Sequence, residues 1–255
     1  MIRALFLLIL LAASPALAVP VLYGDYVGVT VIYTDVTEDS GTDPTPLFGT
    51  PTVSGDSIDF SPPSFNASAT GAGGVDTTDG TLTFGVEAKP GGADSHFIDT
   101  IEFSEAGDFT LAGFGGLGTF VSVTANVFID IFEVDGQDIS QINIQDALVF
   151  TPSNGDWDLL NDGPGPSVNG IWTGSLSVDL TQVLIDNGIP FVDGVTRIQV
   201  TLDNTLIALS ESGTSAFIAK KDADGLSVTA VPEPSALALL AVGSLFAFRR
   251  LRQRS

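Results

Sequence analysis

Hydrophobic and polar residues alternate with a period of two along most of the chain, and this pattern predicts β-strands. In residues 81–87 the alternation is strict and places Leu82, Phe84 and Val86 on one face. Segments rich in β-branched and aromatic residues predict further strands at 27–33, 97–103, 109–114, 120–134, 147–151, 172–179, 196–204, 216–219 and 226–229. Clusters of Gly, Asp, Asn and Pro predict turns or loops at 76–80, 89–94, 135–136, 154–155, 162–166 and 222–225.

One segment has helical spacing instead. Leu180, Val183 and Leu184 recur at intervals of three and four residues, Asp179 can cap the first turn, and Gly188 can end the helix. The pattern predicts a surface helix of two turns at most.

The order of these elements favours an all-β fold. Many short strands with Gly-rich turns, hardly any helix and no alternation of strand and helix predict an antiparallel β-sandwich of jelly-roll type. A β-solenoid is the alternative, but no repeat of fixed period is found. No Pro/Ser linker or charge block divides residues 19–230, so we expect one domain, which we call the body.

The N-terminus has the pattern of a secretory signal peptide. Arg3 supplies the positive charge, residues 4–13 are apolar, and Ala16 and Ala18 fit the small-x-small cleavage rule. We therefore expect export through the Sec translocase, a signal peptide over residues 1–18, and cleavage by signal peptidase to leave Val19 first.

The C-terminus combines three features in order. The tripeptide Pro232-Glu233-Pro234 disfavours helix and strand, so it should be extended and open to a protease. The apolar run 236–248 predicts a transmembrane helix of roughly 20 Å. This is shorter than the ~30 Å hydrocarbon core of a bilayer, but snorkelling arginines and local thinning of the bilayer can make up the difference. The run is followed by Arg249, Arg250, Arg252 and Arg254, which should hold that end in the cytoplasm.

This ending, residues 231–255, resembles the PEP-CTERM sorting signal. The resemblance implies that exosortase, a membrane protease-transpeptidase, cuts near Pro234 after the chain has been anchored transiently in the cytoplasmic membrane. It also implies release to the cell surface or extracellular matrix of a Gram-negative bacterium that makes exopolysaccharide. The role of the body does not follow from it.

Charge excludes some partners for the body. The chain has a net charge of −22, and residues 19–230 hold four basic against thirty acidic residues, a net charge of −26. Such a surface repels nucleic acid and anionic membranes. Cysteine is absent, so an exported chain of this size must be stabilised by its core rather than by disulfides.

The sequence offers little sign of catalysis. His96 is the one histidine, so it is the sole imidazole for a Ser-His-Asp triad, and no Gly-x-Ser-x-Gly or His-Glu-x-x-His motif is present. An exposed loop histidine is the favoured interpretation. Carboxylates are too numerous to locate a glycosidase pair, and most flank turn residues. We expect no enzymatic activity.

Calcium is the one candidate cofactor. Asp156 and Asp158 alternate in one predicted turn, and Asp222 and Asp224 in another. Neither turn contains a full EF-hand loop. Aspartates that cap their own backbone are the favoured interpretation. A specific calcium site is the alternative, and weak diffuse calcium binding is expected ahead of it.

Three functions remain open from the sequence. The first is a non-enzymatic surface or matrix protein. The second is a carbohydrate-binding module for exopolysaccharide, for which Trp157 in a polar loop is the candidate surface aromatic, while Trp172 belongs to the core. The third is a secreted hydrolase.

Overall fold

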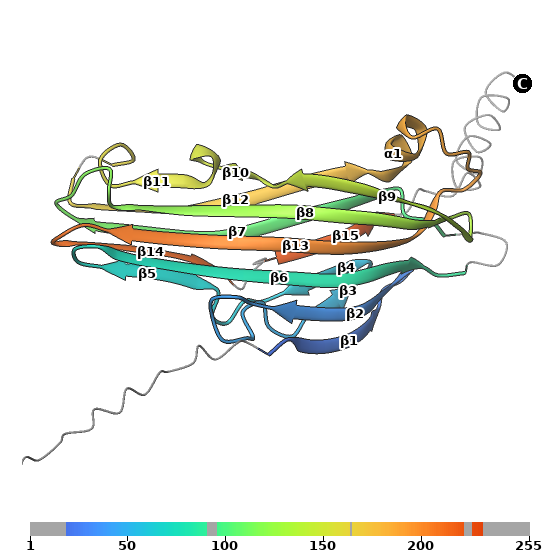
Figure 1. The fold of residues 1–255 in the computed structure, drawn as a ribbon, viewed down its shortest axis with the longest axis horizontal. Coiled ribbons are helices and arrows are strands. Elements are labelled where there is room, and N and C mark those ends of the chain that lie inside the picture. Colours follow the sequence, from blue (N-terminus) through green and yellow to red (C-terminus); the bar gives the residue numbers. More distant parts are fainter. Residues whose placement is uncertain (1–18, 91–95, 164, 222–225, 232–255) are drawn as a thin grey trace, which may run out of the picture.

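A computed structural model describes residues 19–90, 96–163, 165–221 and 226–231. Long antiparallel strands run along the long axis of the molecule (Figure 1). The strands are β1 Val21–Val27, β2 Val31–Asp39, β3 Thr52–Ser54, β4 Ser57–Phe60, β5 Asn66–Thr70, β6 Gly74–Ala88, β7 Thr100–Gly113, β8 Phe120–Val134, β9 Gln137–Ala147, β10 Val149–Thr151, β11 Asp156–Asp158, β12 Ser167–Asp179, β13 Val195–Ser210, β14 Thr214–Lys220 and β15 Leu226–Val231.

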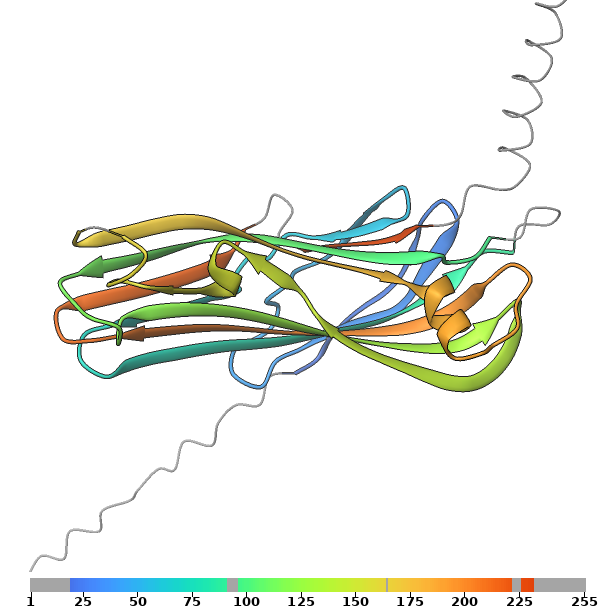
Figure 2. The same ribbon diagram turned by 90° about the horizontal axis from the view of Figure 1, so that it is seen from above.

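These strands form two antiparallel sheets packed as a sandwich, which confirms the predicted fold class at that level. Sheet A has the order β1-β2-β6-β13-β8-β11, with β9 also paired to β8. Sheet B has the order β10-β12-β7-β15-β4-β3, with β14 paired to both β5 and β7. Figure 2 shows the two sheets as separate layers.

The core lies between the layers and follows the alternation in the sequence. In β6 the side chains of Leu82, Phe84 and Val86 are buried, as predicted. Trp172 of β12 is also buried, with 1% of its surface exposed, and its ring meets Phe150 edge-on at 5.7 Å between centroids. Burial of these large side chains supplies the main stabilising free energy of a chain without disulfides.

Several predicted elements coincide with observed ones. The strand predicted at 120–134 is β8, and those at 172–179, 196–204 and 216–219 lie within β12, β13 and β14. Helix α1, Leu180–Asp186, is the short helix that was predicted: the Asp179 side chain accepts a hydrogen bond from the Gln182 backbone, and Gly188 follows in the left-handed region at φ +66.

The strand predicted at 27–33 is wrong, because the segment is two strands joined by a turn at Gly28–Thr30. The carboxylate of Asp56 accepts hydrogen bonds from Thr30 N at 2.7 Å, Thr30 Oγ1 at 2.8 Å and Val31 N at 3.3 Å. A residue 26 positions away thus stabilises the turn. Gly28 is the one turn residue that the local sequence offers at this point.

The turn predicted at 76–80 is also wrong, since these residues belong to β6. Gly80 is needed there for space rather than for a turn: a Cβ at this position would lie 2.7 Å from the Phe65 ring and 3.1 Å from Phe48. Glycine inside a strand often marks such a close approach.

Two further predictions differ from the structure in where the strands begin and end. The strands predicted at 97–103 and 109–114 are one strand, β7, which begins at Thr100 and ends at Gly113. The predicted strand 147–151 spans the end of β9 and all of β10, and most of β9 was not predicted. Among the described strands, β9 pairs with β8 alone. Most of its side chains are polar and exposed, so its sequence resembles a loop.

The expected signal-peptide helix and the expected helix at 236–248 lie outside the described residues. Within the residues that the structure describes, no helix is long and apolar enough to cross a membrane.

Candidate functional site

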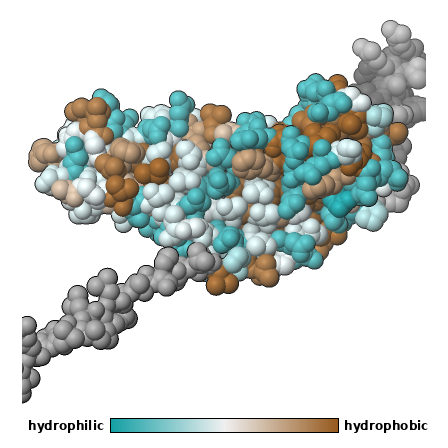
Figure 3. Space-filling model, viewed as in Figure 1, coloured by the Kyte–Doolittle hydropathy of each residue, from teal (hydrophilic) through white to brown (hydrophobic). Residues whose placement is uncertain are grey.

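A depression of about 230 Å³ lies in the outer face of sheet A. It is formed by strands β2, β6, β8 and β13, and Figure 3 shows hydrophilic residues interspersed with hydrophobic ones on the face drawn there. Polar and charged side chains dominate its lining, together with two aromatic residues, of which Phe84 is buried and Phe132 is partly exposed. The residues that line it are Thr34, Asp35, Thr83, Phe84, Gly85, Glu87, Phe132, Arg197, Ile198 and Gln199.

Irregularities in the strand pairing border the depression on both sides. In β2 the register shifts between Thr34 and Thr37, and Asp35 takes a positive φ of 51. On the other side, the β13–β8 pairing shifts on both sides of Arg197. Bulges of this kind bend a strand and redirect its side chains, and they are common beside functional sites. They bring Asp35 and Phe132 to the rim.

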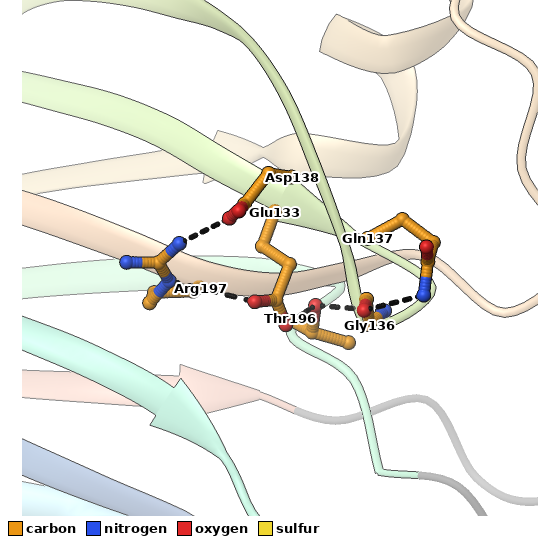
Figure 4. Close-up of polar contacts among 6 residues, drawn as sticks. All are labelled: Glu133, Gly136, Gln137, Asp138, Thr196 and Arg197. Atoms are coloured by element: carbon orange, nitrogen blue, oxygen red, sulfur yellow. Dashed lines mark hydrogen bonds and ion pairs between the residues drawn. The ribbon is translucent and has the colours of Figure 1, made fainter.

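Arg197 is the charged centre of one wall. Its Nη2 atom lies 2.6 Å from Oδ1 of Asp138, and its Nε atom lies 3.6 Å from Oε2 of Glu133 (Figure 4). The guanidinium also lies 5.8 Å from the centre of the Phe132 ring. Because Arg197 keeps 39% of its side chain exposed, these contacts orient the group more than they stabilise the fold.

A series of hydrogen bonds connects the residues next to Arg197 with the β8–β9 turn. The Thr196 hydroxyl donates to Oε1 of Glu133 at 2.7 Å and accepts from the Gly136 backbone at 3.2 Å (Figure 4). The Gln137 side chain then donates to the Gly136 carbonyl at 2.8 Å. The β8–β9 turn at Asp135-Gly136, which the sequence predicted, is therefore connected to the wall of the depression.

Asp135 orders the neighbouring loop. Its carboxylate accepts three backbone hydrogen bonds, from Val192 at 2.7 Å and from Asp193 and Gly194 at 2.8 Å. Partial burial acts to raise the pKa of Asp135, but the three hydrogen bonds outweigh it and hold the pKa below its usual value. The ionised carboxylate thus fixes the segment that leads into β13.

The floor of the depression comes from β6 and β13. Gly85 leaves room for the Thr34 hydroxyl, which a Cβ would contact too closely, and Gln199 exposes its amide. The site therefore offers carboxylates, an amide, hydroxyls, a guanidinium and one ring face. This set suits hydrogen bonding to a polar ligand. Sequence reasoning missed this site, because bulges and cross-strand neighbours depend on register.

The surface platform expected at Trp157 is not found. Trp157 lies in β11 with 3% of its surface exposed, and its indole stacks on Phe109 of β7 at 4.5 Å between centroids. The prediction failed because the polar residues around Trp157 sit on a short strand whose alternation points the indole inward. Trp172, in contrast, is in the core as predicted.

The candidate calcium ligands are only partly within the described residues. Asp158 caps its own turn: Oδ1 accepts from the backbone of Leu160 and Asn161, and Oδ2 accepts from the Asn161 side chain. Asp156 is exposed, and Asp222 and Asp224 lie outside the described residues. Among the residues that are described, no group of three or more His, Asp or Glu side chains is placed to hold a metal ion.

Other residues singled out by sequence occupy the ends and one loop. His96 is half-buried in the segment before β7. Val19, the expected first residue after cleavage, is 76% exposed, and its carbonyl accepts a hydrogen bond from the Thr45 hydroxyl at 2.8 Å. Ala16, Ala18, the tripeptide Pro232-Glu233-Pro234 and the arginines Arg249, Arg250, Arg252 and Arg254 lie outside the described residues.

Comparison with known proteins identifies the C-terminus. Residues 230–253 match the family model of the PEP-CTERM protein-sorting motif, which confirms the resemblance found in the sequence. The motif implies processing by exosortase and an exported protein sorted to the cell surface. A comparison with curated proteins finds no match, and the body is not assigned to a family.

Three solved structures resemble the chain at low identity and low TM-score. One is TmCBM61, a carbohydrate-binding module in complex with β-1,4-galactotriose, at 10% identity and TM-score 0.20, covering 62% of this chain and 70% of that chain. A second is the enzymatically active domain of tailspike protein 4 of bacteriophage CBA120, at 12% identity and TM-score 0.21, covering 79% and 19%. A third is endoglucanase 3 from family GH12 of Trichoderma harzianum, at 12% and TM-score 0.19, covering 77% and 98%. Likenesses this weak carry no argument about function.

Proposed function

We propose that this chain is a non-enzymatic surface or extracellular-matrix protein that exosortase delivers in an exopolysaccharide-producing Gram-negative bacterium. The observation that carries the proposal is the PEP-CTERM motif at residues 230–253. The body contributes a soluble, strongly acidic sandwich, and catalysis forms no part of its role. Its sequence supports this, because it contains no nucleophile motif and a single histidine.

The proposed route has four steps. The Sec translocase exports the chain, signal peptidase cuts after Ala18, the helix 236–248 holds the protein in the cytoplasmic membrane, and exosortase cuts near Pro234. Strand β15 supports the last step, since it ends at Val231, directly before the Pro-Glu-Pro tripeptide. The last described strand thus ends one residue before the tripeptide in the sequence.

We further propose that the sandwich is of jelly-roll type. The long strands support this, because β6, β8 and β13 belong to sheet A while β7, β12 and β14 belong to sheet B. The chain therefore crosses repeatedly between the two sheets, as it does in sandwiches built from Greek keys.

Accessibility of the body to a protease on intact cells tests its delivery to the surface. Intact cells that express the full chain together with exosortase are treated with an added protease, and the body is followed with an antibody. We expect loss of the signal without lysis. A body that stays protected until the cells are opened would contradict delivery to the surface.

A second proposal concerns the depression in sheet A, which we propose binds a segment of exopolysaccharide. The supporting observation is Phe132 beside the carboxylates of Asp35 and Glu87 and the amide of Gln199. Aromatic faces pack on sugar rings, and carboxylates and amides accept or donate hydrogen bonds to hydroxyls. The two carboxylates favour a neutral rather than an anionic sugar, since they outnumber Arg197.

Titration calorimetry with neutral exopolysaccharide tests the binding. Phe132→Ala should weaken binding at least tenfold. Phe128→Ala is the matched control, because Phe128 lies on the same strand, is 38% exposed and does not line the depression. Equal losses for both variants, or no binding by the native protein, would exclude this site without affecting the proposal of surface delivery.

A further inference from the structure

Three of the buried polar side chains lie on the long strands of the sandwich and on β14. Glu105 of β7 and Asn204 of β13 are 0% exposed, and Lys220 of β14 is 3% exposed. A buried polar or charged group destabilises a fold unless it finds partners. These three residues are not part of the site in sheet A, so their burial needs another explanation.

Lys220 and Glu105 are in direct contact. The Nζ atom of Lys220 lies 2.5 Å from Oε2 of Glu105, and both side chains are fully buried. Aromatic rings surround the amine, with the centres of Phe65 and Trp172 at 5.3 and 5.8 Å. Burial lowers the pKa of Lys220, although Glu105 acts in the opposite direction. A lowered pKa favours the neutral amine, which is the nucleophilic form.

Asn204 lies in the other sheet, on the strand that precedes β14. A tight turn joins β13 to β14: Asn204 lies six residues before Ser210, where β13 ends, and Lys220 lies six residues after Thr214, where β14 begins. The two residues therefore occupy corresponding positions on consecutive strands of the two sheets. Packed sheets lie about 10 Å apart, a gap that a long lysine and a short asparagine can span together.

Phe65 provides an independent link between the two residues. Its ring lies beside Lys220 Nζ and also over Gly80, where a Cβ would come within 2.7 Å of it. Gly80 is the cross-strand partner of Asn204 in the pairing of β6 with β13. Lys220 and Asn204 therefore border the same aromatic ring.

The carboxamide of Asn204 is unpartnered among the residues that the structure describes. Within the described part of the chain, neither its Oδ1 nor its Nδ2 atom is bonded, and the same holds for Oε1 of Glu105. Native structures rarely leave fully buried amides in this state. A carboxamide, an amine and a carboxyl group are thus all buried, and the carboxamide and the amine border the same ring.

We propose that Lys220 and Asn204 form an intramolecular amide bond, with Glu105 transferring the proton. In this step Nζ attacks Cγ of Asn204, the Nζ–Cγ bond forms, and the Cγ–Nδ2 bond breaks. Glu105 accepts a proton from Nζ and gives one to Nδ2, which leaves as ammonia. The reaction needs no oxidant or other reactant. It converts the unpartnered groups into a cross-link between the two sheets of a chain that has no cysteine.

Intact-mass spectrometry of the purified full chain under denaturing conditions tests the proposal. We expect the mass to be lower than the sequence requires by one ammonia, with a digest that joins the peptides of Lys220 and Asn204. A mass equal to that of the sequence would overturn the proposal. Loss of one water, with Lys220 joined to Glu105, would overturn the assignment to Asn204.

Variants separate the cross-link from general effects on folding. Lys220→Arg and Asn204→Ala should each restore the full mass, and Glu105→Gln should slow or abolish the loss of ammonia. Lys221→Arg is the matched control, since Lys221 is half-exposed beside Lys220 and pairs with Asp108, and it should keep the lower mass. Because mass is read on denatured protein, a variant that folds poorly still gives an answer. Persistence of the loss in Lys220→Arg would contradict the proposal.

Discussion

The indole of Trp157 stacks on the ring of Phe109, with centroids 4.5 Å apart and planes inclined by 17°. Trp157 lies in β11 of sheet A and Phe109 in β7 of sheet B, so the pair connects the two sheets. The residue that the sequence favours for a sugar platform is thereby part of the core. Sugar binding, if located on this molecule, must use another surface.

Replacement of Trp157 by Ala should lower the free energy of unfolding by about 3–5 kcal/mol, because it removes a buried aromatic side chain and leaves a cavity. Urea denaturation followed by circular dichroism measures the change. Phe114→Ala is the control, since Phe114 is 89% exposed and should change the free energy of unfolding by less than about 0.5 kcal/mol. Similar values for the two variants would contradict the burial of Trp157.

The sequence was sufficient where the signal is local. Helix α1 could be predicted because Asp179, the apolar spacing and Gly188 all lie within one short segment. The long strand β8 could be predicted because it combines β-branched and aromatic residues with a clear turn after it. In contrast, the turn after β1 depends on Asp56, and the glycine in β6 serves the packing of Phe65, so neither is visible locally.

Replacement of Asp56 by Ala should destabilise the protein by about 2 kcal/mol, because three hydrogen bonds to a charged group are lost at the β1–β2 turn. Thermal and urea denaturation give the value. Asp156→Ala removes the same charge from an exposed position and is the matched control. If both variants lose equal stability, the effect of Asp56 comes from net charge and not from the turn.

Replacement of Asp135 by Asn should destabilise the protein at pH 7 by about 1 kcal/mol, because the ionised carboxylate accepts three backbone hydrogen bonds at a partly exposed position. Asparagine tolerates the positive φ of 51 found here, so the change tests charge and not backbone strain.

The same substitution has a defined pH dependence. The pKa of Asp135 is lower in the folded than in the unfolded protein, so its contribution is complete above the unfolded value of about 3.9 and is lost as the pH falls through the folded pKa. The difference between native protein and variant should shrink below about pH 4. A difference that stays constant down to pH 2 would show that ionisation of Asp135 does not stabilise the loop.

Calcium and sodium chloride should raise the melting temperature equally at matched ionic strength. The body has thirty acidic and four basic residues, so both salts screen self-repulsion, and Asp158 already caps its own turn. Thermal denaturation against both titrants measures the effect. Stabilisation by calcium at far lower concentration, abolished by Asp156→Asn or by Asp222→Asn, would instead establish a specific site.

The candidate site could not be predicted from the sequence, because its residues are brought together by strand register. Arg197 and Glu133 are 64 residues apart in numbering, and only the β13–β8 register brings them together. The depression between them and β2 depends on bulges that carry no sequence signal of their own. The sorting motif is the opposite case, because its three parts are contiguous and can be identified without any tertiary structure.

The central claim is that exosortase processes this chain through its C-terminal motif. The direct measurement is the C-terminal mass of the protein released by cells that carry exosortase, for the native chain and for a variant with Pro232, Glu233 and Pro234 all replaced by Ala. We expect the native protein to be released without residues 235–255, while the variant stays in the membrane fraction with its C-terminus intact. Release of the variant in the same processed form as the native protein would contradict the account.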